Sequence, residues 1–242
     1  MNKVYVVGLG PGGEEFMTAQ ARAAMERADV LCGYTVYVDL VKHLYPGKET
    51  YVTPMTRELE RCRWALETAA AGRTVAMVCS GDAGVYGMAG PLLQLAGEYG
   101  GAEVEVVPGV TSALSGAAVL GAPLMHDFCH ISLSDLLTPW PVIEKRIVAA
   151  GEADFVICFY NPRSRGREGH LARAFELLSA SKSAQTPVGV VKSAGRKKQE
   201  KWLTTLGEMD FAPVDMTSLV IVGNKATYIQ DGLMITPRGY VL

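Results

Sequence analysis

Three glycine-bearing loops hold the residues whose types and spacing could bind a small ligand. They read GLGPGG over residues 8–13, SGDAGVYGMAG over residues 80–90 and VPGVTSA over residues 107–113. Each loop follows a short apolar run, as expected where a buried strand ends. Glycines let the main chain approach a ligand closely, and the Asp82 carboxylate could accept hydrogen bonds from an amine or from ribose hydroxyls. The loops therefore predict a polar cradle built largely from main-chain atoms.

The first loop also fits the G-x-G-x-x-G pattern of dinucleotide-binding turns, through Gly8, Gly10 and Gly13. That turn presents N–H groups to a pyrophosphate at a helix N-terminus. Here Pro11 supplies no N–H, two glutamates follow the loop, and no acidic residue ends the second expected strand. We infer that the ligand is not a diphosphate. A nicotinamide-dependent oxidoreductase is therefore the distant alternative.

The polar residues of these loops also have a structural interpretation. Aspartate beside glycine is common in turns, so Asp82 could simply close one. Thr111 and Ser112 follow a Pro-Gly turn at the start of an expected helix, where hydroxyls act as caps. Taken singly, each residue leaves both interpretations open.

Strand and helix patterns alternate along the first half of the chain. The expected strands are residues 4–7, 30–32, 75–79 and 104–107, and the expected helices are 18–28, 56–71, 88–97 and 111–120. Such alternation is typical of a mostly parallel sheet covered by helices, with ligands at the carboxyl ends of its strands. We therefore expect the three loops to meet at one edge of a sheet.

The pattern changes near residues 121–123. The second half predicts strands at residues 128–133, 155–160, 187–191 and 219–222, and helices at 141–150 and 168–181. The sequence therefore predicts an α/β protein of two α/β domains, residues 1–120 and 121–242, with the ligand groove between them.

Composition narrows the class of protein. The chain has 242 residues, 49% hydrophobic and 20% charged, with a formal net charge of −2, so nothing global attracts nucleic acid or an anionic membrane. No apolar run is long enough to span a bilayer, and the N-terminus enters a strand without a signal peptide, which predicts a cytoplasmic protein. The five cysteines are scattered, which argues against an iron–sulfur site, structural zinc or a disulfide framework.

Longer stretches resemble a known family. VVGLGPGGEEFMT, SGDAGVYGMAG and VEVVPGVTSA resemble, in order and spacing, the cofactor loops of the tetrapyrrole (class III) S-adenosylmethionine methyltransferases. Within that family, GYTVYVDLV, LGAPLMHDFCHISLSDLLTPW and VICFYNPRSRGRE are similar to the branch that methylates C17 of precorrin-3B or cobalt-factor III in cobalamin biosynthesis. The resemblance covers the whole chain. It implies the tetrapyrrole methylase fold, with S-adenosylmethionine in the cleft between two domains, usually in a homodimer.

The resemblance also assigns cofactor contacts, for S-adenosylmethionine and its product S-adenosylhomocysteine. These positions lie in the three loops and after two later strands: Gly10, Pro11, Ser80, Gly81, Asp82, Val85, Thr111, Ser112, Asn161 and Ala194. The chain has Ala83 where relatives have proline, and Gly13 where they have aspartate. Neither departure removes a group that a main-chain cradle needs. Pro11 then stiffens a turn that has no phosphate to bind.

The resemblance implies methyl transfer to C17, with contraction of the macrocycle and closure of a ring-A δ-lactone. S-adenosylmethionine already has an activated methyl group, so the protein must mainly align the reactants. Lactone closure moves protons, so acid–base groups are expected. The candidates in residues 125–135 are Asp127, Ser132, Ser134 and Asp135, although Ser134 and Asp135 also read as a turn cap. A methyltransferase acting on another carbon and a non-catalytic tetrapyrrole carrier are the alternatives.

The implied substrate, a precorrin or cobalt-precorrin, bears many carboxylates. His126 and Arg163 are the predicted substrate contacts, and Arg163 begins a basic cluster that continues to Arg167. A second basic cluster spans residues 192–201, and solvated surface charge is the alternative for both clusters. His126, Cys129 and His130 lack a fourth zinc ligand, so we expect no protein-bound metal. Neither nucleic acid nor membrane is an expected partner, but transient contact with neighbouring pathway enzymes is a hypothesis.

Overall fold

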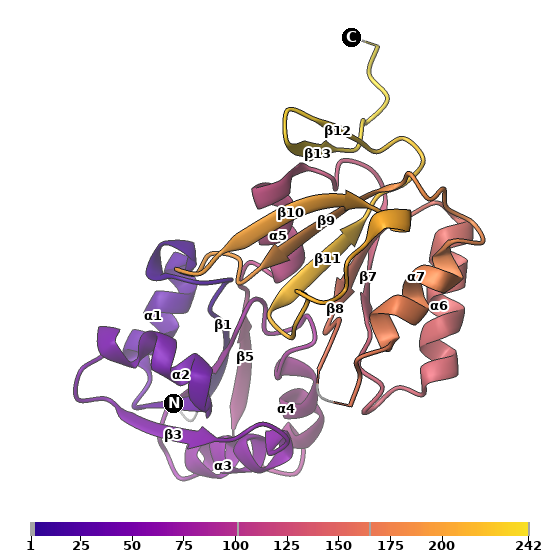
Figure 1. The fold of residues 1–242 in the computed structure, drawn as a ribbon. Coiled ribbons are helices and arrows are strands. Elements are labelled where there is room, and N and C mark those ends of the chain that lie inside the picture. Colours follow the sequence, from indigo (N-terminus) through magenta and orange to yellow (C-terminus); the bar gives the residue numbers. More distant parts are fainter. Residues whose placement is uncertain (1–2, 101, 165, 242) are drawn as a thin grey trace. The chain divides into compact units, whose positions relative to one another are not determined.

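The chain folds into two α/β units, each built on its own five-stranded sheet (Figure 1). The structure is a computed structural model that describes residues 3–100, 102–164 and 166–241. The division between the units falls after Ser112, the first residue of α5 (Ser112–Leu120). Ala113, Ala117 and Leu120 of α5 belong to a core cluster of the second unit, which explains why the division precedes the helix. The predicted α/β fold class is confirmed, while the domain limits 1–120 and 121–242 stay a prediction.

The first unit has a fully parallel sheet in the order β3-β2-β4-β1-β5. Its strands are β1 (Lys3–Gly8), β2 (Val30–Tyr34), β3 (Glu49–Thr53), β4 (Val75–Cys79) and β5 (Glu103–Val107). Its helices are α1 (Ala19–Arg27), α2 (Thr35–Val41), α3 (Glu58–Ala70) and α4 (Ala89–Ala96). Because all five strands are parallel, the three glycine loops leave the sheet at the same edge.

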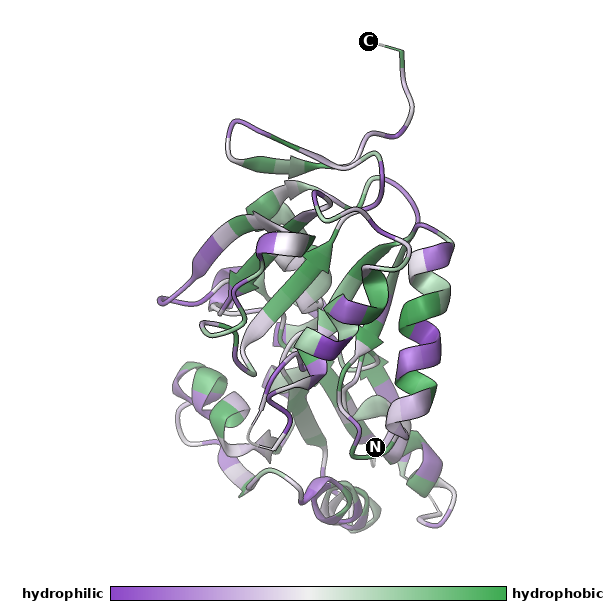
Figure 2. Ribbon diagram, turned by 45° about the vertical axis from the view of Figure 1, so that its right-hand side comes forward, coloured by the Kyte–Doolittle hydropathy of each residue, from purple (hydrophilic) through white to green (hydrophobic). Residues whose placement is uncertain are grey.

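Both faces of this sheet are buried, and the sequence of β1 shows why. Tyr5 and Val7 pack in the core cluster that includes α1 and α2, whereas Val4 and Val6 pack in the cluster that includes α3 and α4. A strand covered on both faces needs apolar residues at every position, so it reads as a continuous run rather than an alternating one. Figure 2 shows this hydrophobic character along the strands.

The second unit has a mixed sheet in the order β10-β9-β11-β8-β7 and a small sheet in the order β12-β13-β6. The strands are β6 (Gly121–Ala122), β7 (Phe128–Ser132), β8 (Val156–Tyr160), β9 (Pro187–Lys192), β10 (Glu200–Thr205), β11 (Ser218–Val222), β12 (Tyr228–Gln230) and β13 (Leu233–Ile235). Helices α6 (Trp140–Glu152) and α7 (His170–Leu178) complete the unit. Strands β7 and β8 are parallel, and β11 is antiparallel to both β8 and β9. The carboxyl ends of β7, β8 and β9 therefore lie at one edge.

Every expected strand and helix is present, and α2, β3, β10 and the small sheet are additional. Within the described residues, no helix combines the length and the hydropathy that a membrane span requires.

Thr18 begins α1 and also contacts the loop after β5. Its Oγ1 accepts a hydrogen bond from the Ala21 N–H at 3.0 Å and donates to the Pro108 carbonyl at 3.4 Å. We expect Thr18→Ala to lower the free energy of unfolding by about 1 kcal/mol, because a helix N-terminal N–H loses its acceptor. Thr18→Ser keeps the hydroxyl and should retain most of that stability in urea unfolding. An equal loss in both variants would assign the effect to the lost methyl group instead.

Candidate functional site

The loops after β1 and β4 are joined by backbone hydrogen bonds. The Leu9 N–H donates to the Cys79 carbonyl at 2.8 Å, and Gly10 and Gly81 exchange bonds of 3.0 and 2.8 Å as an isolated antiparallel bridge. Gly10 and Gly81 have φ values of +78° and +69°, a conformation that glycine adopts without strain. These two predicted cofactor residues therefore fix the first two loops to each other.

The loop after β5 packs on the other two at main-chain contact distance. A Cβ atom on Gly109 would lie 2.3 Å from the Gly81 carbonyl oxygen and 2.6 Å from that of Gly8. A Cβ atom on Gly8 would lie 2.7 Å from the Gly109 nitrogen. Only glycine at these positions lets the three loops meet as they do.

The Asp82 side chain ties the second loop to the third. Its Oδ1 accepts hydrogen bonds from the N–H groups of Gly84 and Val85 at 2.7 and 3.1 Å, and its Oδ2 accepts one from the Gly109 N–H at 3.0 Å. Asp82 thus has the turn-closing role that the sequence left open. Each carboxylate oxygen has two lone pairs, so Oδ2 can still accept from a ligand, and that contact stays a prediction.

The remaining predicted residues of the first unit lie in the same three loops. Pro11 and Thr111 are buried, whereas Ser80, Val85 and Ser112 are half-buried. The sequence gives no sign of Tyr86, which has a positive φ of 54° and a side chain that is 54% exposed. A non-glycine residue in this region costs about 1–3 kcal/mol, and such strain clusters at functional sites.

In the second unit, Ser132 and Asn161 meet at the carboxyl edge of the sheet. The Asn161 Nδ2 donates to the Ser132 Oγ at 2.9 Å, and this Oγ also accepts from the Ser134 N–H at 3.2 Å. Asn161 has a φ of 51°, and Ser193, which precedes the buried Ala194, has a φ of 52°. Two strand ends at this edge thus hold non-glycine residues in the left-handed region.

Asp135 lies in a cluster with His170 and Arg167 that the sequence did not predict. Its Oδ2 is 3.4 Å from the His170 Nε2, and its Oδ1 is 4.0 Å from the Arg167 Nε. The His170 ring also packs against Trp140, with centroids 4.2 Å apart. His170 begins α7, far from Asp135 in sequence, so only the fold could reveal the pair.

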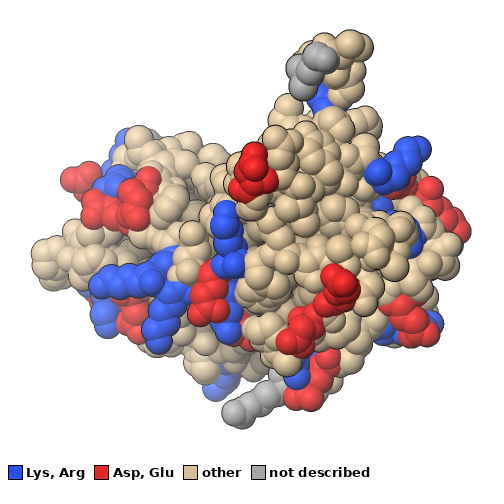
Figure 3. Space-filling model, turned by 45° about the horizontal axis from the view of Figure 1, so that its top comes forward, with Lys and Arg blue, Asp and Glu red and all other residues tan. Residues whose placement is uncertain are grey.

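Several basic residues at this edge contact the protein itself. The Arg163 guanidinium donates to the carbonyls of Phe211 and Ala212 at 2.9 and 3.1 Å. Lys192 is 2.7 Å from Asp215, whose hydrogen bond raises the Lys192 pKa. Arg165, the middle residue of the first basic cluster, lies outside the described residues. On the face drawn in Figure 3, Lys and Arg lie among Asp and Glu, in keeping with the small net charge.

His126 and Asp127 lie at the opposite end of β7 from Ser132. The strand of five residues separates the two groups by ~16 Å. The Asp127 side chain is 79% exposed, and its N–H donates to the His126 Nδ1 at 2.8 Å. The structure therefore brings Ser132, Ser134 and Asp135 to one edge and leaves His126 and Asp127 at the other.

The possible zinc ligands of this strand are partly buried. Burial raises the pKa of the Cys129 thiol to about 11 and lowers the pKa of His130. In the part of the chain that the structure describes, no three His, Cys, Asp or Glu side chains are grouped to hold a metal ion.

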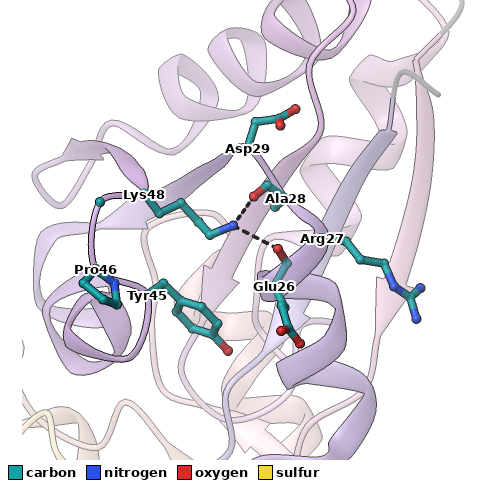
Figure 4. A pocket seen from close by; sticks show the side chains of 8 residues that line it. Glu26, Arg27, Ala28, Asp29, Tyr45, Pro46 and Lys48 are labelled. Atoms are coloured by element: carbon teal, nitrogen blue, oxygen red, sulfur yellow. Dashed lines mark hydrogen bonds between the residues drawn. The ribbon is translucent and has the colours of Figure 1, made fainter.

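A hollow of about 540 Å³ lies elsewhere in the first unit, lined by residues 26–29 and 45–48 (Figure 4). The Lys48 ammonium reaches across it and donates to the carbonyls of Glu26 and Ala28. These carbonyls end α1, so Lys48 acts as a helix cap. The hollow lies before β2 and β3, at the edge opposite the glycine loops.

Comparison with known proteins decides the family. Residues 3–210 match the tetrapyrrole (corrin/porphyrin) methylases, a stretch that includes every predicted site residue. The chain belongs to this family. The resemblance noted from the three loops is thereby confirmed.

Individual tetrapyrrole methylases match nearly the whole chain. A Salmonella typhimurium protein described as a probable cobalt-factor III C(17)-methyltransferase is 69% identical over 238 residues, which are 98% of this chain and 99% of that protein. The crystal structure of the methyltransferase CobJ superposes with a TM-score of 0.91 at 38% identity and covers 97% of this chain and 99% of its own. A Thermus thermophilus uroporphyrin-III C-methyltransferase complexed with S-adenyl homocysteine has a TM-score of 0.70 at 27% identity, over 91% and 97% of the two chains.

The contact between the three loops predicts how they respond to a single methyl group. Gly109→Ala places a Cβ atom against the Gly81 and Gly8 carbonyls, and we expect the free energy of unfolding to fall by about 1–3 kcal/mol. Gly90→Ala is the matched control, because no atom lies within 4 Å of its Cβ position in α4. Gly90→Ala should leave the free energy of unfolding unchanged or raise it by up to ~1 kcal/mol. Equal urea midpoints for the two variants would contradict the close packing of the loops.

Proposed function

We propose that this protein is an S-adenosylmethionine-dependent methyltransferase that methylates C17 of cobalt-factor III in the synthesis of vitamin B12. Methylation is accompanied by contraction of the macrocycle and closure of the δ-lactone. The observation on which this rests is the 69% identity, over almost the full length of both chains, to a protein described as a probable cobalt-factor III C(17)-methyltransferase. Precorrin-3B, the corresponding substrate without cobalt, is the neighbouring candidate.

The chemistry of the three loops fits the cofactor. They offer main-chain N–H and carbonyl groups and the Asp82 carboxylate, which match an amino acid and ribose hydroxyls. They contain no Lys or Arg to neutralise a diphosphate. S-adenosylhomocysteine is bound in the Thermus thermophilus relative. We infer that Gly10, Pro11 and the loop residues around Asp82 and Thr111 hold the cofactor, with Asn161 and Ala194 completing the set.

The residues of the chain would then orient the reactants and move protons. S-adenosylmethionine supplies an activated methyl group when bound. The close-packed loops hold their own geometry before a ligand arrives, which favours an aligned approach. At the edge of the second unit, the Ser132–Asn161 pair and the Asp135–His170 pair provide hydroxyl, amide and carboxylate groups for the proton transfers of lactone closure.

Substrate binding and assembly are further parts of the proposal. Arg163 uses one guanidinium nitrogen for two carbonyls, so its other N–H groups can meet a substrate carboxylate. His126 and Asp127, at the far end of β7, would act only on a substituent that reaches that edge. We further propose a cytoplasmic homodimer without nucleic-acid or membrane partners. Transient contact with the next pathway enzyme would protect an unstable product.

Product analysis tests the function. With methyl-labelled S-adenosylmethionine and cobalt-factor III, we expect one methyl group to be transferred, with its NMR signal at C17 of a ring-contracted lactone. A methyl group on another carbon would assign the protein to a different branch of the family. Tight substrate binding without transfer in a single turnover would indicate a carrier. Thermal protection by NAD, and none by S-adenosylhomocysteine, would favour the oxidoreductase.

Asp82 offers a second test, specific to the cofactor. In Asp82→Asn one oxygen can still serve Gly84 and Val85, but the amide then points a donor at the Gly109 N–H. We expect S-adenosylhomocysteine affinity in calorimetry to fall by about 10-fold, or ~1.4 kcal/mol, because a half-buried acceptor is lost. Asp39→Asn, which removes only an exposed ion pair with Lys42, is the control. Unchanged affinity in Asp82→Asn would leave Asp82 with its turn role alone.

A further inference from the structure

Two adjacent leucines stand in solvent on the loop that joins β7 to α6. The side chains of Leu136 and Leu137 are 73% and 98% exposed. Only the residues near the C-terminus, Tyr240 and Val241, match them among the exposed large hydrophobic residues of the described chain. Single exposed leucines are common on proteins, but an adjacent exposed pair at a candidate site forms an apolar surface that can bind a ligand.

The base of this loop is held firmly on the sheet side. Leu133 is fully buried, and its N–H donates to the Tyr160 carbonyl at 2.9 Å, which extends the β7–β8 pairing. The Ser134 N–H donates to the Ser132 Oγ. Asp135, the residue immediately before the leucines, faces His170 and Arg167 at 3.4 and 4.0 Å.

The helix side of the loop is held as well. Pro139 is the residue before α6, and Trp140, the first residue of that helix, packs on the His170 ring. His170 therefore contacts both ends of the loop, through Asp135 and through Trp140. Its Nδ1 is buried and has no hydrogen-bond partner within the described residues, so the Asp135 contact is made through Nε2.

The surroundings of the leucines indicate what they contact. They follow the carboxyl end of β7, at the edge that also holds Asn161 and Arg163. The Arg167 guanidinium is almost buried and contacts Asp135, the Leu133 carbonyl and the Met216 Sδ, so it belongs to the base of the loop. An apolar surface at the same edge as the partly exposed Arg163 matches a flat macrocycle whose rim bears carboxylates. A fully hydrophobic partner would leave the remaining N–H groups of Arg163 without acceptors.

We propose that Leu136 and Leu137 pack against the face of the tetrapyrrole macrocycle, and that His170 is a positioning residue that holds their loop. This inference rests on the proposed function, and it names residues that select and align the substrate without taking part in methyl transfer. Because the leucines already lie in solvent, the unbound protein does not depend on them for its fold.

The double variant Leu136→Ser/Leu137→Ser tests the contact. We expect its KM and Kd for cobalt-factor III to rise by at least about tenfold. The affinity for S-adenosylhomocysteine and the melting temperature should not change, because neither depends on side chains that are exposed in the unbound protein. Val241→Ser in the same unit is the matched control, because Val241 is fully exposed, and it should leave every value unchanged.

The outcomes separate this inference from the proposed function. If the unmodified protein transfers no methyl group to cobalt-factor III, the proposed function fails. If it does, and the double variant binds that substrate as tightly, the leucines are not a substrate contact. A change of sedimentation behaviour without a change in KM would instead assign them to contacts between chains, and would overturn the inference.

Variants of His170 test the positioning role. His170→Gln keeps an N–H group near the position of Nε2, so it should retain substrate KM. His170→Leu loses the Asp135 contact, so it should raise the KM for cobalt-factor III by several-fold while S-adenosylhomocysteine affinity stays the same. A loss in kcat with no change in KM, or equal effects of the two variants, would contradict the role.

Discussion

The close approach of three main-chain loops at the carboxyl edge of the first sheet is the constraint on which the candidate site depends. A Cβ atom on Gly8 or Gly109 would clash with main-chain atoms of the facing loop, and the Gly10–Gly81 bridge and the Asp82 carboxylate hold the loops in that arrangement. Such a site is formed by the fold itself rather than by mobile side chains. It therefore presents fixed polar groups before any ligand binds, which lowers the entropy cost of binding.

The second unit also presents fixed polar groups, but it does so with side chains. Its edge holds side-chain pairs, Ser132 with Asn161 and Asp135 with His170, rather than close-packed glycines. Asn161 and Ser193 adopt backbone conformations that favour glycine, and this local strain is balanced by the buried sheet below them. A main-chain cradle in one unit and a side-chain edge in the other are consistent with a division between holding a cofactor and handling a substrate.

The sequence predicted the elements whose apolar patterns are strong. Continuous runs such as residues 75–79 identified the buried strands, and glycines after them identified the loops. The sequence did not predict helix α2, because its residues, TVYVDLV, favour a strand. Only the burial of Val38 and Val41 against the sheet makes this segment helical. Strands β3 and β10 are polar edge strands without an apolar run. The Asp82–Gly109 and Asp135–His170 contacts join residues far apart in sequence, so only the fold reveals them.

The proposed function requires the main chain of the three glycine loops to hold S-adenosylmethionine. Amide NMR during titration with S-adenosylhomocysteine tests it most directly, because each N–H reports its own surroundings. We expect the signals of Gly10, Gly81 and Gly109 to shift together and to saturate at one ligand per chain. Saturable binding that leaves these three amides unmoved, and shifts signals elsewhere in the chain, would contradict it.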